Sequence, residues 1–258
     1  MPHVQDPTRP DDDLTAHAYR SIRRMIMEGG LPPGRRMSHR SLAAQLGIGR
    51  SPVRDAVLQL EAEGFLVQRA QRGVLLRELT PTELGEIYDL RVVVEPLLAE
   101  RAANRRDVTH LAALRQTVDE TVAAADRSDL LEWFANEENR RHTAQLDLRF
   151  HMLILEAAGN SIARRAFGSS HVLALTFAWH IGHGKPESFA ARIRETAAEH
   201  AAVFEAIRAR DAVAAGEAMR KHVAGANVVV PERYAALVHA ASEAEEQANA
   251  RSAAAAVR

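Results

Sequence analysis

The sequence predicts a mainly α-helical protein: an N-terminal winged helix-turn-helix followed by an antiparallel all-α bundle of about six or seven helices. Three observations predict this class. The 258 residues are 47% apolar but only 5% aromatic, with abundant alanine, the strongest helix former. Apolar residues recur at helical spacing from residue 80 to about residue 234. Two short strand-like runs between residues 65 and 77 follow a pair of short helices, as in a winged domain.

Four segments follow from the changes in pattern along the chain. Residues 1–13, with three prolines and an acidic end, are expected to be a disordered tail. Residues 14–79 form the winged domain, and Thr80-Pro81-Thr82-Glu83 marks the boundary because it combines a proline, a threonine cap and an acidic first turn. Residues 80–234 form the helical bundle. Residues 235–258 lose the apolar stripe and are expected to be frayed or disordered.

The composition excludes several kinds of site and location. The chain has no cysteine, so it has no disulfide, and a metal ion would be bound by His, Asp or Glu. No apolar run reaches the roughly 18 residues that cross a bilayer, and the first 13 residues contain no apolar segment of signal-peptide type. We therefore expect a cytoplasmic protein without a membrane partner.

A helix-turn-helix is predicted around residues 41–66. Gly47-Ile48-Gly49 separates two short helices, and Ser51 is expected to cap the second, with Pro52 at its first position. The second helix has an apolar face at helical spacing, made of Val53, Val57 and Leu60. Arg50 and Arg54 share a different face near its start. Paired arginines at the beginning of the second helix are typical of a recognition helix that enters the major groove of DNA.

A hairpin follows this helix and extends the basic surface. Phe65–Gln68 and Val74–Arg77 read as strands, and Arg72-Gly73 at the tip would place a charge and an unhindered backbone near phosphate or the minor groove. Between Leu14 and Leu79 there are 11 Lys+Arg and 5 Asp+Glu, a net charge of +6, whereas the whole chain carries −1. This segregation of charge indicates a nucleic-acid-binding domain.

The segment LPPGRRMSHRSLAAQLGIGRSPVRDAVLQLEAEGFLVQRAQRGVLL closely resembles the DNA-binding domain of the GntR family of bacterial transcriptional regulators. The family usually has Ser or Thr where this chain has Gly49, so Ser51 is expected to take over part of that role. Solvated surface arginines are the competing explanation for the basic residues. The residues expected to contact DNA are Arg40, Arg50, Ser51, Arg54, Arg72 and Gly73.

Four residues of the predicted bundle have the spacing of a metal site. Asp147 and His151 stand four apart in a helix expected over Leu130–Ala158, so they share one face. His200 and His222 lie ten and eleven residues from the turn at Arg210-Asp211, so antiparallel helices would hold them at the same height. Asp147, His151, His200 and His222 would suit zinc, nickel, manganese or iron. The alternative is that these histidines are ordinary core residues.

The segments DLRFHMLILEAAGN, EHAAVFEAIRARD and AMRKHV resemble the three signature segments of the all-helical effector (FCD) domain of FadR-like GntR regulators. The resemblance implies a divalent metal ion, zinc first, bound by the matching aspartate and three histidines. IYDLRVVVEPLLAERAA resembles the first helix of that domain. Its Arg91 suits a carboxylate ligand, because the guanidinium is a planar, permanently charged fork. A structural salt bridge between Arg91 and Glu95 explains the residue equally well.

The function predicted from these patterns is a DNA-binding transcriptional regulator, a repressor, that binds operator DNA as a homodimer. A small carboxylate metabolite at the metal site would control its affinity for the operator. Two alternatives remain open at this level: a metal-dependent hydrolase-like enzyme, and a regulator that senses the metal ion itself. We expect no enzymatic activity, because catalysis would leave the basic winged domain without a role.

Overall fold

A computed structural model describes residues 10–27, 31, 36–69, 73–166, 168, 172, 174 and 186–256. The chain divides into two compact units, Met1–Glu78 and Leu79–Arg258. The structure is mainly helical and contains one small hairpin, in agreement with the predicted fold class.

The first unit is built on three helices, α1 (Pro10–Met27), α2 (His39–Leu46) and α3 (Arg50–Ala62). α1 packs against α3, and α3 also packs against α2. The side chains that form this core are fully or almost fully buried: Ala18, Ile22, Ile26, Leu42, Val53, Val57 and Leu60. The predicted helix-turn-helix is therefore present, and its apolar face packs inward as expected.

The turn between α2 and α3 explains where each helix ends and begins. Ser38 caps α2 in a capping box with Ser41, and Gly47, at φ 67°, ends it in the left-handed conformation that favours glycine. The expectation that Ser51 caps α3 was wrong: Gly49 is the N-cap, without a side-chain hydrogen bond. α3 therefore begins at Arg50, and Pro52 sits at the third helical position, where a backbone N–H still has no partner within the helix.

A two-stranded antiparallel sheet forms the wing, with β1 (Leu66–Arg69) paired to β2 (Gly73–Leu76). α3 ends in a Schellman motif, in which Phe65 N donates to Leu60 O and Gly64 N donates to Glu61 O, both at 2.9 Å. Gly64 has φ 81°, which this motif requires. Met37 extends the sheet through a bridge to Val74. Arg72, at the predicted tip, lies outside the described residues.

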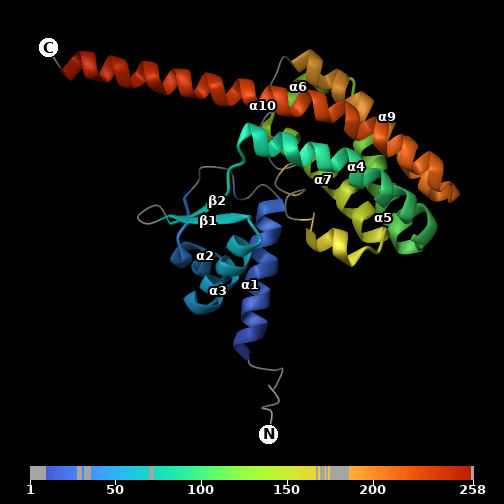
Figure 1. Ribbon diagram of the computed structural model, residues 1–258, viewed down its shortest axis with the longest axis horizontal. Coiled ribbons are helices and arrows are strands. Elements are labelled where there is room, and N and C mark those ends of the chain that lie inside the picture. Colours follow the sequence, from blue (N-terminus) through green and yellow to red (C-terminus); the bar gives the residue numbers. More distant parts are fainter. Residues whose placement is uncertain are drawn as a thin grey trace, which may run out of the picture. The chain divides into compact units, whose positions relative to one another are not determined.

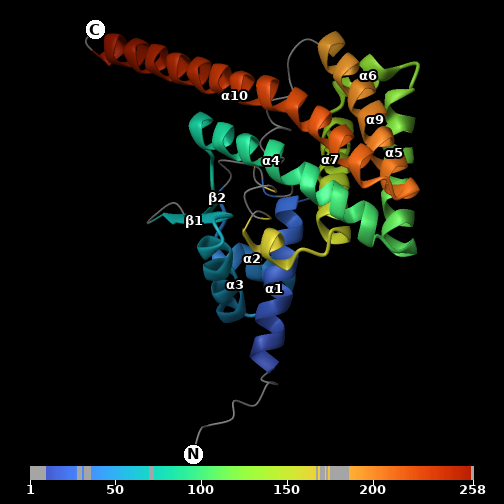
Figure 2. The same cartoon turned by 45° about the vertical axis from the view of Figure 1, so that its right-hand side comes forward.

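The second unit is an all-helical bundle (Figures 1 and 2). Its described helices are α4 (Pro81–Arg105), α5 (Val108–Ala125), α6 (Leu130–Ala135), α7 (Glu137–Ala157), α9 (Pro186–Ala209) and α10 (Ala212–Ala256). A capping box between Thr80 and Glu83, with Pro81 at the first position, begins α4. α10 runs antiparallel along α4: Asn227 lies near Asp89, and the hydroxyl of Tyr234 donates to Leu79 O.

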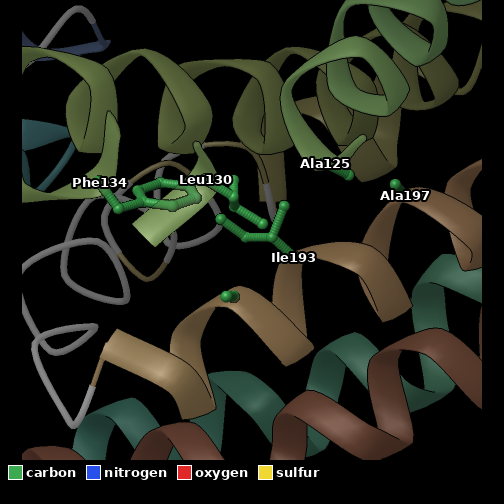
Figure 3. Close-up of a cluster of buried hydrophobic side chains, with 6 residues drawn as sticks. Ala125, Leu130, Phe134, Ile193 and Ala197 are labelled. Carbon is green, nitrogen blue, oxygen red and sulfur yellow. The ribbon is translucent and has the colours of Figure 1, made fainter. Parts of the chain in front are cut away.

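The single helix expected over Leu130–Ala158 was wrong, because the structure divides it into α6 and α7. Asn136 causes the break: its side chain accepts a 2.8 Å hydrogen bond from Glu138 N and caps α7. α6 packs on α9 through a small apolar cluster that includes Leu130, Phe134 and Ile193 (Figure 3). The short helix thus closes one side of the bundle while α7 turns its buried face inward.

At both ends of the chain the helices extend into segments that were predicted to be disordered or frayed. α1 begins at Pro10 rather than after residue 13, and α10 continues to Ala256, across most of the segment expected to be frayed or disordered. Residues 235–256 include 11 alanines and 3 glutamates, so intrinsic helix propensity extends the helix without an apolar stripe. Among the described residues, none of the helices has the length and hydropathy that a membrane span requires.

Candidate functional site

Three helices of the second unit bring Asp147, His151, His200 and His222 together. α7 contributes the aspartate and the first histidine, α9 contributes His200, and α10 contributes His222. One ligand atom from each residue lies within 4.8 Å of the others. The three histidines are at most 3% exposed. The structure therefore assembles, at one buried point, the four residues that the sequence singled out.

The distances between these atoms fit the coordination shell of a small divalent ion. His222 Nε2 lies 3.1 Å from His151 Nε2 and 3.3 Å from His200 Nε2. Asp147 Oδ1 lies 3.4 Å from His200 Nε2 and 3.8 Å from His151 Nε2. Ligands at about 2.1 Å from a tetrahedral ion are separated by about 3.4 Å. All three histidines present the same ring nitrogen, as ligands of one ion would.

Two glutamates hold the other ring nitrogens. His151 Nδ1 lies 2.5 Å from Glu95 Oε2, and His222 Nδ1 lies 2.9 Å from Glu199 Oε2. A carboxylate at Nδ1 fixes the tautomer in which Nδ1 carries the proton and Nε2 presents its lone pair. Arg192 approaches Glu199 at 3.5 Å and also pairs with Glu195 at 2.8 Å, so the two carboxylates share its charge. Two of the three histidines are thereby oriented for metal coordination.

His200 is oriented by packing instead. Its ring stacks on Phe150 with the centroids 3.8 Å apart and the planes 14° from parallel. Its Nδ1 is buried and has no hydrogen-bond partner among the described residues. Burial lowers the pKa of His200 to about 3, and burial also lowers the pKa of His222. Both imidazoles are therefore neutral at pH 7, which is the form that binds metal.

Asp147 supplies the negative charge at this point. Burial alone would raise the pKa of its carboxyl, but the hydrogen bond from His200, with a further electrostatic contribution from the neighbouring imidazoles, holds that pKa far below its usual range. The group is thus a carboxylate across the physiological pH range. One anionic oxygen and three neutral nitrogens form a donor set suited to zinc and neighbouring divalent metals.

Arg91, on α4, is 1% exposed and lies next to this cluster. Its Nε donates a 2.6 Å hydrogen bond to Glu95 Oε1, and its Nη2 is 3.5 Å from His151 Nε2. The salt bridge weighed against a ligand role is therefore present. Its Nη1, however, is buried and has no hydrogen-bond partner among the described residues. The salt bridge thus occupies one edge of the guanidinium and leaves one donor group available.

The predicted DNA-contacting residues that the structure describes are exposed: Arg40, Arg50, Ser51, Arg54 and Gly73. Arg50 occupies the first position of α3. A positive charge at a helix N-terminus opposes the helix dipole, so helix stability does not explain this arginine. None of the three arginines has an ion pair with another residue in the part of the chain that the structure describes. The side chains of Arg50 and Arg54 are exposed in the first turns of the candidate recognition helix, and that of Arg40 is exposed near the start of α2.

Gly73 has a structural explanation besides the predicted DNA contact. It has φ 76°, and a Cβ atom there would lie 2.3 Å from the carbonyl oxygen of Met37. That carbonyl accepts a 2.8 Å hydrogen bond from Val74 N. Glycine is thus required for the wing to approach the chain before α2. A backbone contact of Gly73 with DNA is therefore not needed to account for the residue.

Comparison with known families decides the identity of both units. Residues 14–76 match the model for bacterial regulatory proteins of the gntR family, and residues 86–225, more than half of the chain, match the FCD domain. The chain belongs to the GntR family. It is a DNA-binding transcriptional regulator whose FCD domain contains the four-residue cluster described above.

Relatives of this GntR regulator are themselves regulators. The chain is 24% identical to the HTH-type transcriptional repressor RspR of Escherichia coli over 85% of this chain and 90% of RspR. It is 28% identical to a probable D-xylose utilization operon transcriptional repressor of Paenarthrobacter nicotinovorans, over 77% and 80% of the two chains. These relatives and families are regulators and not enzymes, in agreement with the expectation that this protein is not an enzyme.

Solved structures confirm the fold. E. coli McbR/YncC superposes with a TM-score of 0.68 at 20% identity, covering 86% of this chain and 98% of that chain. A putative GntR regulator from Rhodococcus sp. RHA1 superposes with a TM-score of 0.63 at 21% identity, over 84% and 96% of the two chains. A winged helix-turn-helix followed by an all-helical domain is thus the architecture of both neighbours and of this chain.

Neither Glu199 nor Phe150 was predicted to belong to the site, and Glu95 was predicted only as a salt-bridge partner of Arg91. Glu199 precedes His200 in the chain, yet successive residues on a helix point about 100° apart, so adjacency gave no reason to place it beside the cluster. Its contact is with His222 on the neighbouring helix. Such contacts depend on how α9 and α10 pack, which spacing within one helix does not reveal.

Proposed function

We propose that this regulator binds a divalent metal ion through Asp147, His151, His200 and His222, and that a small carboxylate metabolite bound there controls its affinity for operator DNA. The observation that carries the proposal is the convergence of three Nε2 atoms and one carboxylate oxygen at a buried point. The carboxylates at two Nδ1 atoms support it, because they prepare those imidazoles as ligands. A divalent ion there would supply a positive centre able to bind an anion.

The charges around the cluster favour an anionic ligand. Asp147 and Glu95 are negative and Arg91 is positive, so these three buried or part-buried groups sum to −1. Further out, Arg192 is shared between Glu199 at 3.5 Å and the exposed Glu195 at 2.8 Å, so it offsets only part of their charge. With a divalent ion bound, the centre would carry +1, and a single carboxylate would neutralise it. The unpartnered Nη1 of Arg91 is a second donor suited to the same group.

The DNA-binding unit would read the operator through α3 and the wing, in a homodimer whose two-fold symmetry matches a pseudo-palindromic site. Repressor names among the relatives favour repression as the outcome. The ligand can act only by binding two arrangements of the dimer with different affinities. The carboxylate would therefore favour one arrangement of the dimer, and operator affinity would fall or rise according to whether that arrangement fits the operator less well or better.

Native mass spectrometry with elemental analysis tests the metal first. We expect one divalent ion per chain in the wild type and none in the double variant His200→Ala, His222→Ala. Operator binding is then titrated with a panel of organic acids, with and without chelator. Metal-free wild-type protein would contradict the site. Loss of operator affinity on chelation alone, without any acid, would favour metal sensing over carboxylate sensing.

A further inference from the structure

One face of α4 exposes an apolar stripe that the monomer does not cover. Leu90, Val93 and Leu97 are 53%, 72% and 52% exposed. They recur with spacings of three and four residues, so they lie in one row along the helix. The opposite face of α4 is buried in the core and includes Tyr88, Leu98 and Ala102. α4 therefore has two apolar faces, and among the described residues only one of them packs against other helices.

Charged residues of opposite sign bracket this row. Glu86 lies one turn before Leu90 and is exposed. Arg101 lies one turn after Leu97, and its Nε is buried without a hydrogen-bond partner. Neither residue has an ion pair with any residue that the structure describes. The row thus begins with an unpaired negative charge and ends with an unpaired positive charge, with apolar side chains between them.

The row from Glu86 to Arg101 is self-complementary: it matches a second copy of the same row that runs in the opposite direction. In an antiparallel pair of α4 helices related by a two-fold axis between Val93 and Val94, Leu90 faces Leu97 of the second copy. Val93 then faces Val94, and Glu86 faces Arg101, because all three pairs are centred on the same point. A two-fold interface requires this kind of self-complementarity. The contact would extend over about 23 Å of helix, at 1.5 Å per residue.

We infer that the Glu86–Arg101 face of α4 is the two-fold interface of the effector domain, and that it takes a second copy of this chain. The inference rests on the homodimer of the proposed function and adds its surface and register. Two Glu86–Arg101 ion pairs would form per dimer and flank an apolar centre. Exposed Val228 of α10 extends the apolar surface, because it follows Asn227, which reaches α4 at Asp89. This neighbouring helix adds area towards the roughly 800 Å² per partner of a stable interface.

A charge swap tests the register in the full-length protein. Glu86→Arg and Arg101→Glu should each weaken dimerisation by about tenfold or more, measured by analytical ultracentrifugation, because each places two like-charged pairs in the dimer. The double variant, which restores both pairs with reversed sign, should return to within about threefold of the wild type. Glu156→Arg, an exposed reversal on α7, is the matched control and should not change dimerisation.

Cysteine cross-linking checks the same register without altering charge. The chain has no cysteine, so Leu90→Cys with Leu97→Cys introduces the only two thiols. Within one chain these positions are about 10 Å apart, too far for a disulfide, whereas across the dimer they face each other. We expect a covalent dimer on mild oxidation, and none from Val108→Cys with Leu131→Cys, two exposed positions elsewhere.

The outcomes separate this inference from the metal proposal. Single reversals that leave dimer affinity unchanged, a double variant as impaired as the singles, or absence of the cross-link would each overturn the register. A monomeric wild type would overturn the homodimer together with its interface. The four proposed metal ligands lie on α7, α9 and α10, and none of the variants replaces a ligand or Glu95. Retention of metal in these variants would therefore show that the fold and the metal proposal survive any of these results.

Discussion

The Nδ1 atom of His151 lies 2.5 Å from Oε2 of Glu95, and this contact directs the Nε2 atom of the same ring towards the cluster. The other oxygen of Glu95 accepts a hydrogen bond from Arg91. One carboxylate therefore connects a predicted metal ligand to the predicted anion-binding residue. A ligand that contacts Arg91 would act on the same hydrogen-bonded group that orients His151.

Replacing Glu95 by glutamine should weaken metal binding by about 10–100-fold, the usual effect of removing a carboxylate that orients a ligating histidine. The amide keeps the size of the side chain but no longer fixes the tautomer by charge. Competition with a chromophoric chelator measures the affinity. Glu156→Gln on α7 is a suitable control, because that residue is exposed and has no ion pair with any residue that the structure describes. Equal affinities of both variants would exclude an orienting role for Glu95.

Arg50→Ala and Arg54→Ala should each weaken specific operator binding by about 1–3 kcal/mol if the side chain reads a base edge. Loss of a phosphate contact would instead weaken binding to all sequences alike and reduce its salt dependence. Fluorescence anisotropy with operator and scrambled DNA at several salt concentrations distinguishes the two. Arg115→Ala, in the other unit, is the control. Unchanged binding by both variants would rule out α3 as the recognition helix.

Gly73→Ala should destabilise the DNA-binding unit more than Gly64→Ala does. Both residues have positive φ, which costs a non-glycine residue about 1–2 kcal/mol. Only at Gly73 would the new Cβ also meet a backbone carbonyl, that of Met37, while nothing lies within 4 Å at Gly64. Thermal unfolding and operator binding of both variants measure the difference. Equal losses would show that the wing moves freely away from Met37.

Features set by local sequence were predictable, and features set by packing were not. The helix breaks at Gly47 and at Arg210-Asp211 were visible because glycine and turn residues act within a few positions. The break at Asn136 was missed because the apolar pattern continues across it. The capping signal was nevertheless present, since Asn136 is followed by two glutamates that favour the first turn of a helix.

The candidate metal cluster shows the same division. The spacing of Asp147 and His151 within α7 placed both on one face, and the turn before α10 placed His200 and His222 at one height. The glutamates that orient the histidines could not be assigned, because Glu95 and Glu199 contact residues of other helices. Arg91 has the predicted salt bridge with Glu95, and its Nη1 has no hydrogen-bond partner among the described residues, so its role towards a carboxylate ligand stays a prediction.

Removing the metal should lower the thermal stability of the helical unit and leave the DNA-binding unit unchanged. A ligand that binds only the folded state at 100 times its Kd stabilises that state by about 2.7 kcal/mol. For a domain of this size, each kcal/mol corresponds to about 2–4 °C, so chelation should lower the melting temperature by about 5–10 °C. His222→Ala should melt at the same temperature with and without chelator, because one of its four ligands is missing. Calorimetry resolves the two units if they unfold separately. If neither chelator nor added zinc changes the melting temperature of the wild type, the four residues do not bind metal and have only a structural role in the core.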